Sequence, residues 1–578
     1  MSKQECILFG AAQSGLRAME ILSDQYKIVA FADNDSKKWG TEINGIFVIP
    51  YSELKKNKDI LIIVSSVYYR SISRQLAKDG FYNIKIFYLI GDFGGNGEIH
   101  YVLFDYSDKE LFSECYRNGV FSSALQKDIA LNYPGIKKRK VILFCAYIFP
   151  PLGGPGVQRS LKFVKYLRDY GYEPVVLTVG KNDRHIPIDE SFLDEIPSGI
   201  QIIRVDEVFP TDVLTVEAQQ EILNLYYGVT GNDKWVDEFL EFYMSSKGAR
   251  LLPDDKITWV NECLKVIIEL INLNDIYAVY TTGYPFSSFF LGYFMKSSYG
   301  IPWVADYRDP WAANENYWNE RYYQYIDSKK IMQEIEEKCI DQMNHIIVCS
   351  PPMKPEMQEL YKINPSKISV ITNGFDEEDF KFLQPERKKN TKFTLCHNGN
   401  ISNYVEATMI IIIINELIQK GRIDADKIEY VINGDVQSEQ LRKMKNADMY
   451  SVLRFNGRLP HIESLKIASD SDLLVLHGSY GEGSENGLTG KIFEYMMLRR
   501  PVICFALPTS MMAKTLQECR IGVPFDKNQK AEAGEYFMKL YNDWRKSDYT
   551  FAPDFDEISK YNRRTLTGDL ALIFDGLS

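Results

Sequence analysis

The sequence predicts an α/β protein made of successive doubly wound units, in which helices cover both faces of parallel sheets. Short runs of consecutive apolar residues, such as 141–146 and 473–476, are typical of strands buried on both faces. These runs alternate with segments whose apolar residues recur at helical spacing, and such alternation produces parallel sheets. Turns with glycine or asparagine follow several strands, as at 433–434, and mark the edge where α/β proteins build binding sites.

Length and composition limit the classes of protein that the chain can belong to. At 578 residues it is too long for one core, so about two to four domains are expected. Its 45% hydrophobic and 25% charged content is ordinary for globular protein. The net charge of -11 argues against nucleic acid as a partner. Any anionic ligand must therefore be held by local cations and oriented N–H groups.

The chain is expected to be cytoplasmic and to bind no metal. It has no run of eighteen apolar residues, and its first residues lack the layout of a signal peptide. The nine cysteines are scattered without a Cys-x-x-Cys pair, and the six histidines are equally dispersed. This pattern argues against disulfides and against a zinc site.

The first predicted unit, residues 1–93, has the pattern of a nucleotide-binding domain. Its glycine turn at 10–15 follows a short buried strand, and Asp33 and Asp35 follow the second strand, where ribose contacts occur in Rossmann folds. The two aspartates also have the spacing of a metal-binding Asp-x-Asp motif, but their place directly after such a strand argues against that reading. A less regular linker is expected over 94–139.

The second predicted unit, residues 140–385, contains the most informative segment of the chain. A glycine-rich turn at 150–159 lies between the apolar run 141–146 and a helical pattern. Its glycines let the backbone bend sharply and approach a ligand closely. The start of the following helix offers unpaired N–H groups and a positive dipole end. This turn is suited to an anionic or sugar-like ligand.

The third predicted unit, residues 386–550, repeats the alternation of strand and helix. Its strands are expected at 392–396, 428–432, 452–455, 473–476 and 501–505. The final segment, 551–578, is expected to be a helix that packs back on the second unit. The second and third units are similar parallel-sheet domains in tandem, so their strand-end turns are expected to face each other across a cleft.

Five blocks that follow predicted strands resemble, in their order, the bacterial glycosyltransferases of family 4. The resemblance covers about residues 140–575 and rests on blocks at 150–159, 281–288, 305–311, 371–376 and 481–495. It implies the GT-B fold, in which two Rossmann-like domains face each other across a cleft. It also implies a retaining transfer of a sugar, typically a hexose, from a nucleotide-sugar donor to an acceptor glycan in bacterial cell-surface polysaccharide biosynthesis. Acceptors in this family are often lipid-linked, which implies peripheral contact with the inner face of the cell membrane.

The resemblance also implies the donor site. No cofactor or metal is expected, because cations and helix N-terminal amides stabilise the departing diphosphate. Lys491 lies in the first turn of such a helix, and Glu494 matches the family glutamate that hydrogen-bonds the ribose. The donor-binding residues implied are Gly154, Gly156, Arg458, Glu482, Asn486, Gly487, Leu488, Thr489, Lys491 and Glu494.

The chain departs from the family pattern at two places. Asn486 stands where the first of two family glutamates is expected, so Glu485 or Glu482 is the candidate replacement. Many relatives also carry an arginine and a lysine near the start of the third unit, and residues 397–403 contain neither. Arg458 and Lys491 are then the remaining cations for the diphosphate.

Asp306 is the candidate group on the acceptor side. It ends a predicted strand at roughly the position where the family places a histidine or aspartate beside the transferred sugar. A carboxylate there could accept the acceptor proton or steady an oxocarbenium-like sugar. Arg308 is placed to pair with either Asp306 or Asp309. The expected catalytic residues are Asp306, Lys491 and Glu485.

The first unit resembles the nucleotide-sugar-binding domains fused to sugar acetyltransferases. The resemblance implies a nucleotide site formed by Gly10, Ser14, Gly15 and Asp33. The alternative is a packing domain with a degenerate site.

Two other classes of function stay open for the whole chain. One is a non-catalytic GT-B-shaped scaffold that binds a nucleotide sugar, which fits the missing cations. The other is an NAD-dependent epimerase or oxidoreductase, which the absence of a suitably placed Tyr-x-x-x-Lys pair in the first unit disfavours.

Overall fold

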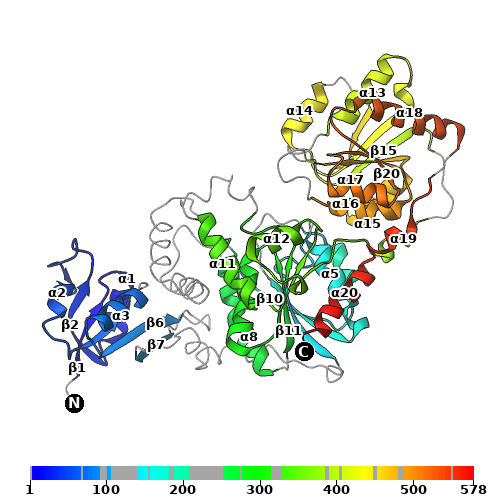
Figure 1. Ribbon diagram of the computed structural model, residues 1–578. Helices are drawn as coiled ribbons and strands as arrows, with labels where there is room; N and C mark the ends of the chain where they lie inside the picture. Colours follow the sequence, from blue (N-terminus) through cyan, green and yellow to red (C-terminus); the bar gives the residue numbers. More distant parts are fainter. Residues whose placement is uncertain are drawn as a thin grey trace.

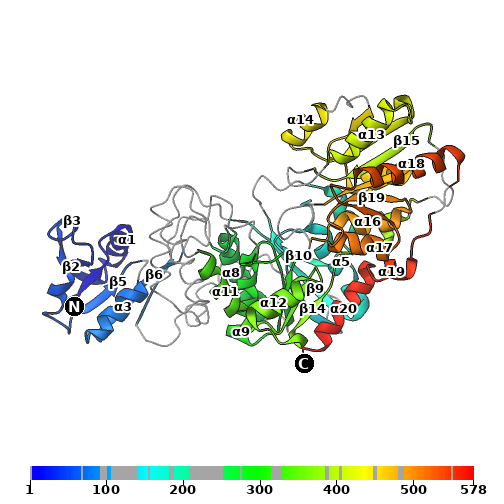
Figure 2. The ribbon, with the colours of Figure 1, turned by 45° about the horizontal axis from the view of Figure 1, so that its top comes forward.

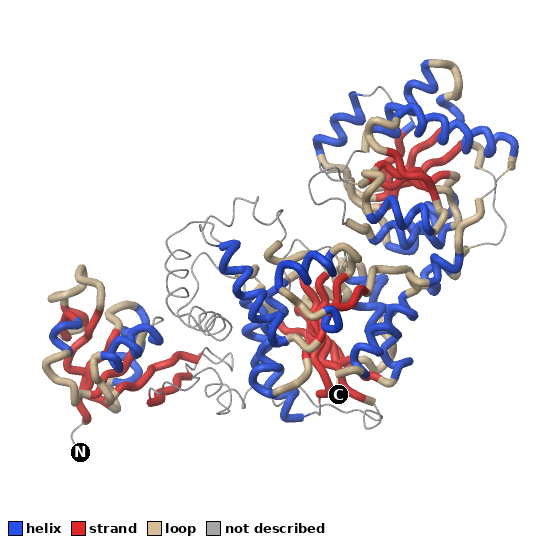
Figure 3. Tube along the Cα trace, in the orientation of Figure 1, coloured by secondary structure: helices blue, strands red, loops and turns tan. Residues whose placement is uncertain are grey.

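The protein is described from a computed structural model. The residues that it describes are 3–66, 69–90, 100–105, 139–153, 156–180, 188–207, 252–254, 256–273, 276–313, 328–383, 390–401, 407–446, 452–478, 487–548 and 551–577. Within them the chain forms three separate sheets, each flanked by helices (Figure 1 and Figure 3). The predicted α/β class with parallel sheets is confirmed.

The N-terminal sheet is mixed and has the order β3-β4-β2-β1-β5-β6-β7. Its strands are β1 (Gln4–Phe9), β2 (Tyr26–Asp33), β3 (Glu42–Ile43), β4 (Ile46–Pro50), β5 (Leu61–Val64), β6 (Ile84–Ile90) and β7 (His100–Asp105), with helices α1 (Gln13–Leu22), α2 (Tyr51–Leu54) and α3 (Tyr69–Lys78). Strand β7 pairs antiparallel with β6. The first sheet therefore extends past residue 93 into the stretch that was expected to be linker.

The middle sheet is parallel throughout and has the order β10-β9-β8-β11-β12-β13-β14. Its strands are β8 (Lys140–Cys145), β9 (Tyr172–Val179), β10 (Gln201–Val205), β11 (Ile276–Gly283), β12 (Trp303–Tyr307), β13 (His345–Val348) and β14 (Ile368–Val370). The helices around it are α5 (Val157–Leu167), α8 (Ile257–Leu273), α9 (Phe289–Tyr299), α11 (Ser328–Gln342) and α12 (Met353–Tyr361). All eight residues of β9 are buried, as expected for a strand covered on both faces.

The C-terminal sheet is also parallel and has the order β17-β16-β15-β18-β19-β20. Its strands are β15 (Phe393–Asn398), β16 (Ile428–Asn433), β17 (Leu453–Phe455), β18 (Leu473–His477), β19 (Val502–Phe505) and β20 (Gly522–Phe525). Its helices are α13 (Met409–Gln419), α14 (Ser438–Asn446), α15 (His461–Asp470), α16 (Gly490–Leu498), α17 (Met511–Glu518) and α18 (Lys530–Lys546). The apolar helix α13 lies in this domain's core beside α18.

The end of the chain returns from the C-terminal domain to the middle domain. After α19 (Phe555–Ser559), helix α20 (Arg563–Asp575) packs beside α5 (Figure 1 and Figure 2). Tyr172 Oη donates to Asp575 at 2.6 Å, and Tyr277 Oη donates to the carbonyl of Phe574 at 2.9 Å. No helix in the described part of the chain combines the length and apolar character that a membrane span requires.

The hinge between the middle and C-terminal domains contains a glycine that close packing requires. The returning chain forms a bridge from Asn562 to Phe375. A Cβ added to Gly374 would lie 2.0 Å from the carbonyl oxygen of Tyr561, so no other residue fits there without movement. The Asn-Gly pair at 373–374 is thus explained by backbone packing.

Candidate active site

The glycine turn of the middle domain places a helix start beside an arginine. Helix α5 begins at Val157, its N-cap Gly156 makes no side-chain capping hydrogen bond, and its first turn carries no acidic residue. The first N–H groups of the helix therefore lack the usual capping oxygen. A Cβ added to Gly156 would lie 1.6 Å from Arg308 Nη1, so the guanidinium rests directly on this turn. Gly154 lies outside the described residues.

Arg308 is fixed by backbone rather than by a carboxylate. Its Nε donates to the carbonyl of Gly283 at 3.2 Å, and its Nη2 donates to the carbonyl of Tyr284 at 2.5 Å. No acceptor for its Nη1 occurs among the residues that the structure describes. The expected pairing with Asp306 or Asp309 is not seen there. Arg308 instead presents a positive charge at the start of α5.

Asp306 is enclosed by hydrogen-bond donors. Arg159 forms a bidentate ion pair with it, at 2.8 Å from Nε and 2.6 Å from Nη2. Tyr280 Oη and Thr282 Oγ1 donate to the same carboxylate at 2.7 Å and 3.1 Å. Asp306 has no exposed surface.

The expected catalytic role of Asp306 does not fit this geometry. Both of its oxygens accept hydrogen bonds, and a carboxylate without exposed surface cannot reach an acceptor hydroxyl. Arg159 also donates to the carbonyl of Thr372 at 2.8 Å, so the pair connects β12 and α5 to the hinge. We therefore assign Asp306 to positioning of Arg159. Sequence reasoning missed Arg159 in this role because the two residues are 147 positions apart.

Lys491 carries a partly buried charge at the start of a second uncapped helix. Helix α16 begins at Gly490, its N-cap Thr489 makes no side-chain capping hydrogen bond, and its first turn has no acidic residue. The Lys491 side chain runs across Gly399, where an added Cβ would lie 2.2 Å from its Cε. Its Nζ has neither a hydrogen bond nor an ion pair within the described residues. Burial lowers the pKa of Lys491, and the attraction of Glu494 only partly opposes this.

Glu494 connects the C-terminal domain to the glycine turn. His461 Nε2 lies 3.0 Å from Glu494 Oε1, and Gln158 Nε2 lies 3.4 Å from the same oxygen. Gln158 is the second residue of α5, so this contact brings the starts of α5 and α16 together. The two uncapped helix starts, Lys491 and Arg308 therefore border one region between the domains.

Comparison with known protein families finds a match for the middle of the chain. Residues 245–379 match the family profile described as Glycosyltransferase Family 4. This stretch is therefore similar to glycosyltransferases of family 4. The match includes three of the five blocks that carry the resemblance, and the tandem parallel-sheet domains have the GT-B fold. Residues 2–87 match the profile described as C2185-like, N-terminal. Comparison with curated proteins finds no match.

Solved structures that resemble the chain include glycosyltransferases, all at low similarity. A glycosyltransferase from Rickettsia africae is 14% identical, with a TM-score of 0.45 over 76% of this chain and 98% of that one. WaaG, a glycosyltransferase involved in lipopolysaccharide biosynthesis, is 13% identical, with a TM-score of 0.44 over 75% and 100%. Sucrose-phosphate synthase from Thermosynechococcus elongatus is 12% identical, with a TM-score of 0.46 over 76% and 99%.

The structure describes some of the remaining residues that were predicted to bind the donor. Gly487, Leu488 and Thr489 lead into α16 beside Lys491. Arg458 forms an ion pair with Asp435 in which both side chains are more than half exposed, so its charge already has a partner. Glu482, Glu485 and Asn486 lie outside the described residues.

A cluster of three carboxylates lies near the hinge. Oxygens of Glu195, Asp376 and Asp379 are close enough to one another to hold a metal ion. Lys162, whose side chain is 1% exposed, forms ion pairs with all three, and Lys165 adds a pair to Asp376 at 2.7 Å. Two ammonium groups thus already pair with the three carboxylates, and these ion pairs tie α5 to the hinge.

The glycine turn of the N-terminal domain is closed by its own aspartate. Asp33 accepts hydrogen bonds from the N–H of Ala11 at 2.8 Å and the N–H of Asp35 at 2.9 Å, and from Lys38 Nζ at 2.9 Å. Burial opposes the charge of Asp33, but these hydrogen bonds outweigh it and lower the pKa of Asp33. A Cβ added to Gly15 would lie 1.8 Å from the carbonyl oxygen of Gly10. Close packing thus accounts for Gly15, and Ser14 is buried.

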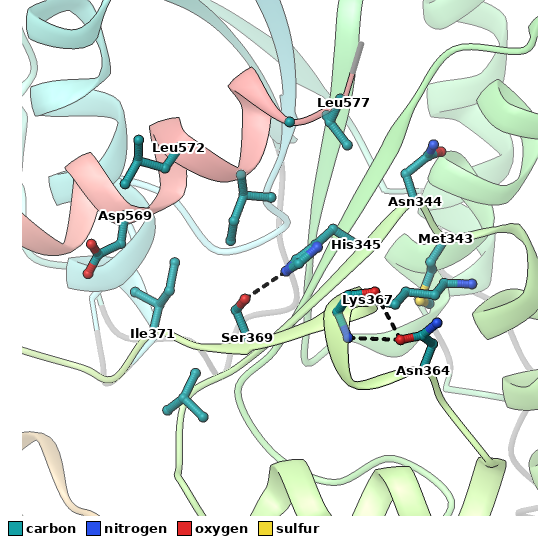
Figure 4. A pocket seen from close by; sticks show the side chains of 14 residues that line it. Met343, Asn344, His345, Asn364, Lys367, Ser369, Ile371, Asp569, Leu572 and Leu577 are labelled. Carbon is teal, nitrogen blue, oxygen red and sulfur yellow. Dashed lines mark hydrogen bonds between the residues drawn. The ribbon is translucent and has the colours of Figure 1, made fainter.

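A cavity of about 870 Å³ lies on another side of the middle domain (Figure 4). Residues of β13, β14 and α20 line it, and His345 Nε2 lies 2.9 Å from Ser369 Oγ in its wall. Burial and the charge of Lys354 lower the pKa of His345 to about 4. None of the predicted site residues lines this cavity, so it is separate from the region between the domains.

Proposed function

We propose that the protein is a retaining glycosyltransferase that moves a sugar from a nucleotide-sugar donor to an acceptor glycan. The observation that carries the proposal is Lys491, a partly buried cation with no hydrogen bond or ion pair in the described residues, at the uncapped start of α16. The contact between Gln158 and Glu494 places this helix start opposite that of α5. The family 4 match over residues 245–379 supports the same reaction.

The region between the domains is suited to a diphosphate leaving group. As the bond to the sugar breaks, negative charge grows on the phosphate oxygens. Lys491, Arg308 and the first N–H groups of two helices lie in place before the reaction, so they can stabilise that charge without reorganising. We propose that these groups act without a bound metal. Among the described residues, the carboxylates that lie close enough together to hold a metal ion are already ion-paired with lysine ammonium groups.

The route of the acceptor proton follows from the geometry of Asp306. That carboxylate is enclosed, so we propose that the departing phosphate oxygen accepts the proton of the acceptor hydroxyl. In such a path the hydroxyl oxygen attacks the anomeric carbon on the face from which the diphosphate leaves, and configuration is retained. Asp306 contributes by holding Arg159 against the hinge.

The setting of the reaction is proposed from the resemblance. The acceptor is a glycan or lipid-linked glycan of bacterial cell-surface polysaccharide biosynthesis, the protein is cytoplasmic, and it contacts the inner face of the membrane. The N-terminal domain is proposed to bind a nucleotide or nucleotide sugar without catalysing a reaction. That proposal rests on the resemblance, because the nearby cation Lys38 is already paired with Asp33.

The experiment is incubation of the full chain with a panel of labelled nucleotide sugars, with release of nucleoside diphosphate as the readout. Release, with loss of at least about tenfold in turnover for Lys491→Ala, supports the transferase. The exposed Lys530, paired with Glu416, provides the matched control Lys530→Ala. Binding without release would favour the scaffold, and a change in nicotinamide absorbance would favour the oxidoreductase.

A further inference from the structure

His461 lies between the two glycosyltransferase domains. It is the first residue of α15, in the C-terminal domain, and its side chain is 10% exposed. Its Nε2 lies 3.0 Å from Glu494 Oε1 and 2.9 Å from Gln158 Nε2, which belongs to the middle domain. Its ring centre is 5.7 Å from that of Phe192, also in the middle domain. His461 therefore touches the donor-side glutamate and the opposite wall at once.

Glu494 uses only one of its oxygens for these contacts. Both His461 and Gln158 approach Oε1. Within the described residues, Oε2 receives no hydrogen bond. A carboxylate held by one oxygen has a fixed rotamer and leaves the other oxygen for a ligand. The hydroxyls of a ribose are donors that suit such an oxygen.

The charges around His461 favour a protonated ring. Burial opposes the charge, but the hydrogen bond and attraction of Glu494 outweigh burial and raise the pKa of His461. Asp379 adds attraction and Lys162 adds repulsion from the middle-domain side. A charged ring donates its Nε2–H to Glu494 Oε1 and holds it more firmly than a neutral donor would. The contact of Gln158 Nε2 with the ring is then not a hydrogen bond, because both nitrogens are donors.

We propose that His461 is a positioning residue of the donor site, which holds Glu494 so that its Oε2 receives the ribose hydroxyls. The inference rests on the proposed function, because it requires a nucleoside diphosphate in the region between the domains. His461 touches no reacting atom. Its effect is on how well the protein distinguishes a ribose from a sugar that lacks hydroxyls.

The test measures binding of full-length chain to UDP or GDP, whichever binds more tightly, and to the 2′,3′-dideoxy form of the same nucleotide. The unaltered chain should prefer the ribose form by about tenfold or more, as expected for a hydrogen bond to a charged group. His461→Ala should reduce this preference to about threefold or less, while the affinity for the dideoxy form stays nearly unchanged. His461→Gln, which can still donate to Glu494, should recover part of the preference.

The matched control is His345→Gln, a histidine in the separate cavity (Figure 4), which should keep the full preference. In the background of Glu494→Ala, adding His461→Ala should change nothing further, because the coupled partner is gone. Full preference in His461→Ala, or equal weakening of both nucleotides, would overturn the inference. Absence of UDP and GDP binding by the unaltered chain would overturn the proposed function itself.

Discussion

The side chain of Lys491 occupies the space that a Cβ on Gly399 would need, with its Cε 2.2 Å from that position. Gly399 has φ +103°, a conformation that side chains rarely adopt, and it follows β15 directly. The absence of a side chain at Gly399 therefore leaves the space through which the Lys491 side chain passes, and it also permits the backbone turn. This relationship makes the backbone at 399 part of the proposed diphosphate site.

Gly399→Ala is predicted to displace Lys491 and to weaken binding of a nucleoside diphosphate by about tenfold or more. Gly457→Ala is the matched control, because Gly457 also has positive φ, +68°, but an added Cβ would meet nothing within 4 Å. Both variants bear backbone strain of about 1 kcal/mol. Calorimetric titration compares them, and equal affinities in the two variants would contradict the steric explanation.

Arg308→Met is predicted to lower turnover by about tenfold to a hundredfold, because it removes the cation on the middle-domain side of the diphosphate. Arg454→Met removes an arginine that is about half exposed and pairs with Glu429 at 3.4 Å, so it should leave turnover unchanged. Steady-state release of nucleoside diphosphate provides the readout. Normal turnover in Arg308→Met would show that the turn at Gly156 does not contact the leaving group.

Asp306→Asn is predicted to destabilise the fold by about 3 to 5 kcal/mol, because it leaves the buried guanidinium of Arg159 without its counter-charge. Asp435→Asn breaks the exposed pair with Arg458 and should cost less than about 1 kcal/mol. Denaturant unfolding followed by circular dichroism measures both. A normally stable Asp306→Asn chain with no turnover would restore Asp306 as a catalytic group.

Glu336 makes the stability of the middle domain depend on pH. It is 2% exposed, accepts hydrogen bonds from Tyr361 Oη at 2.6 Å and from the N–H of Ala312 at 2.8 Å, and burial raises its pKa to about 7. Because the folded chain keeps this proton while the unfolded chain loses it near the ordinary value of 4.5, stability should fall as pH rises from about 4.5 to 7.

Glu336→Gln is predicted to remove this dependence and to be more stable than the unaltered chain above pH 7 by on the order of 1 to 3 kcal/mol. Unfolding free energies at pH 5, 6, 7 and 8 would check it, since these values bracket about 7, the pKa of Glu336. Parallel curves for the two proteins across this range would mean that Glu336 is not the titrating group.

The sequence predicted the elements because parallel strands buried on both faces leave a local signal. The run at 473–476 and the glycine turn at 150–159 are recognisable without knowledge of their neighbours, and β18 and α5 form where expected. The position of Lys491 at a helix start was likewise predictable from the residues around it. Strand β7, which pairs antiparallel with β6, was missed because the stretch after residue 93 is less regular in its pattern.

The contacts that define the candidate site were not predictable in the same way. Arg159 and Asp306 meet only once the sheet is assembled, and nothing in the sequence near Asp306 indicates that Tyr280 and Thr282 also enclose it. His461 follows a proline at an ordinary helix start, so no local signal distinguishes it. Contacts between residues far apart in sequence thus determine which of the predicted residues can still take part in the reaction.

The central claim is that Lys491 and the facing helix starts hold a diphosphate. The most direct measurement is the affinity of the full chain for a nucleoside diphosphate and for the corresponding nucleoside, before and after Lys491→Ala. The account predicts that the variant binds the diphosphate at least about tenfold more weakly and the nucleoside equally well. Unchanged affinity for the diphosphate would contradict it.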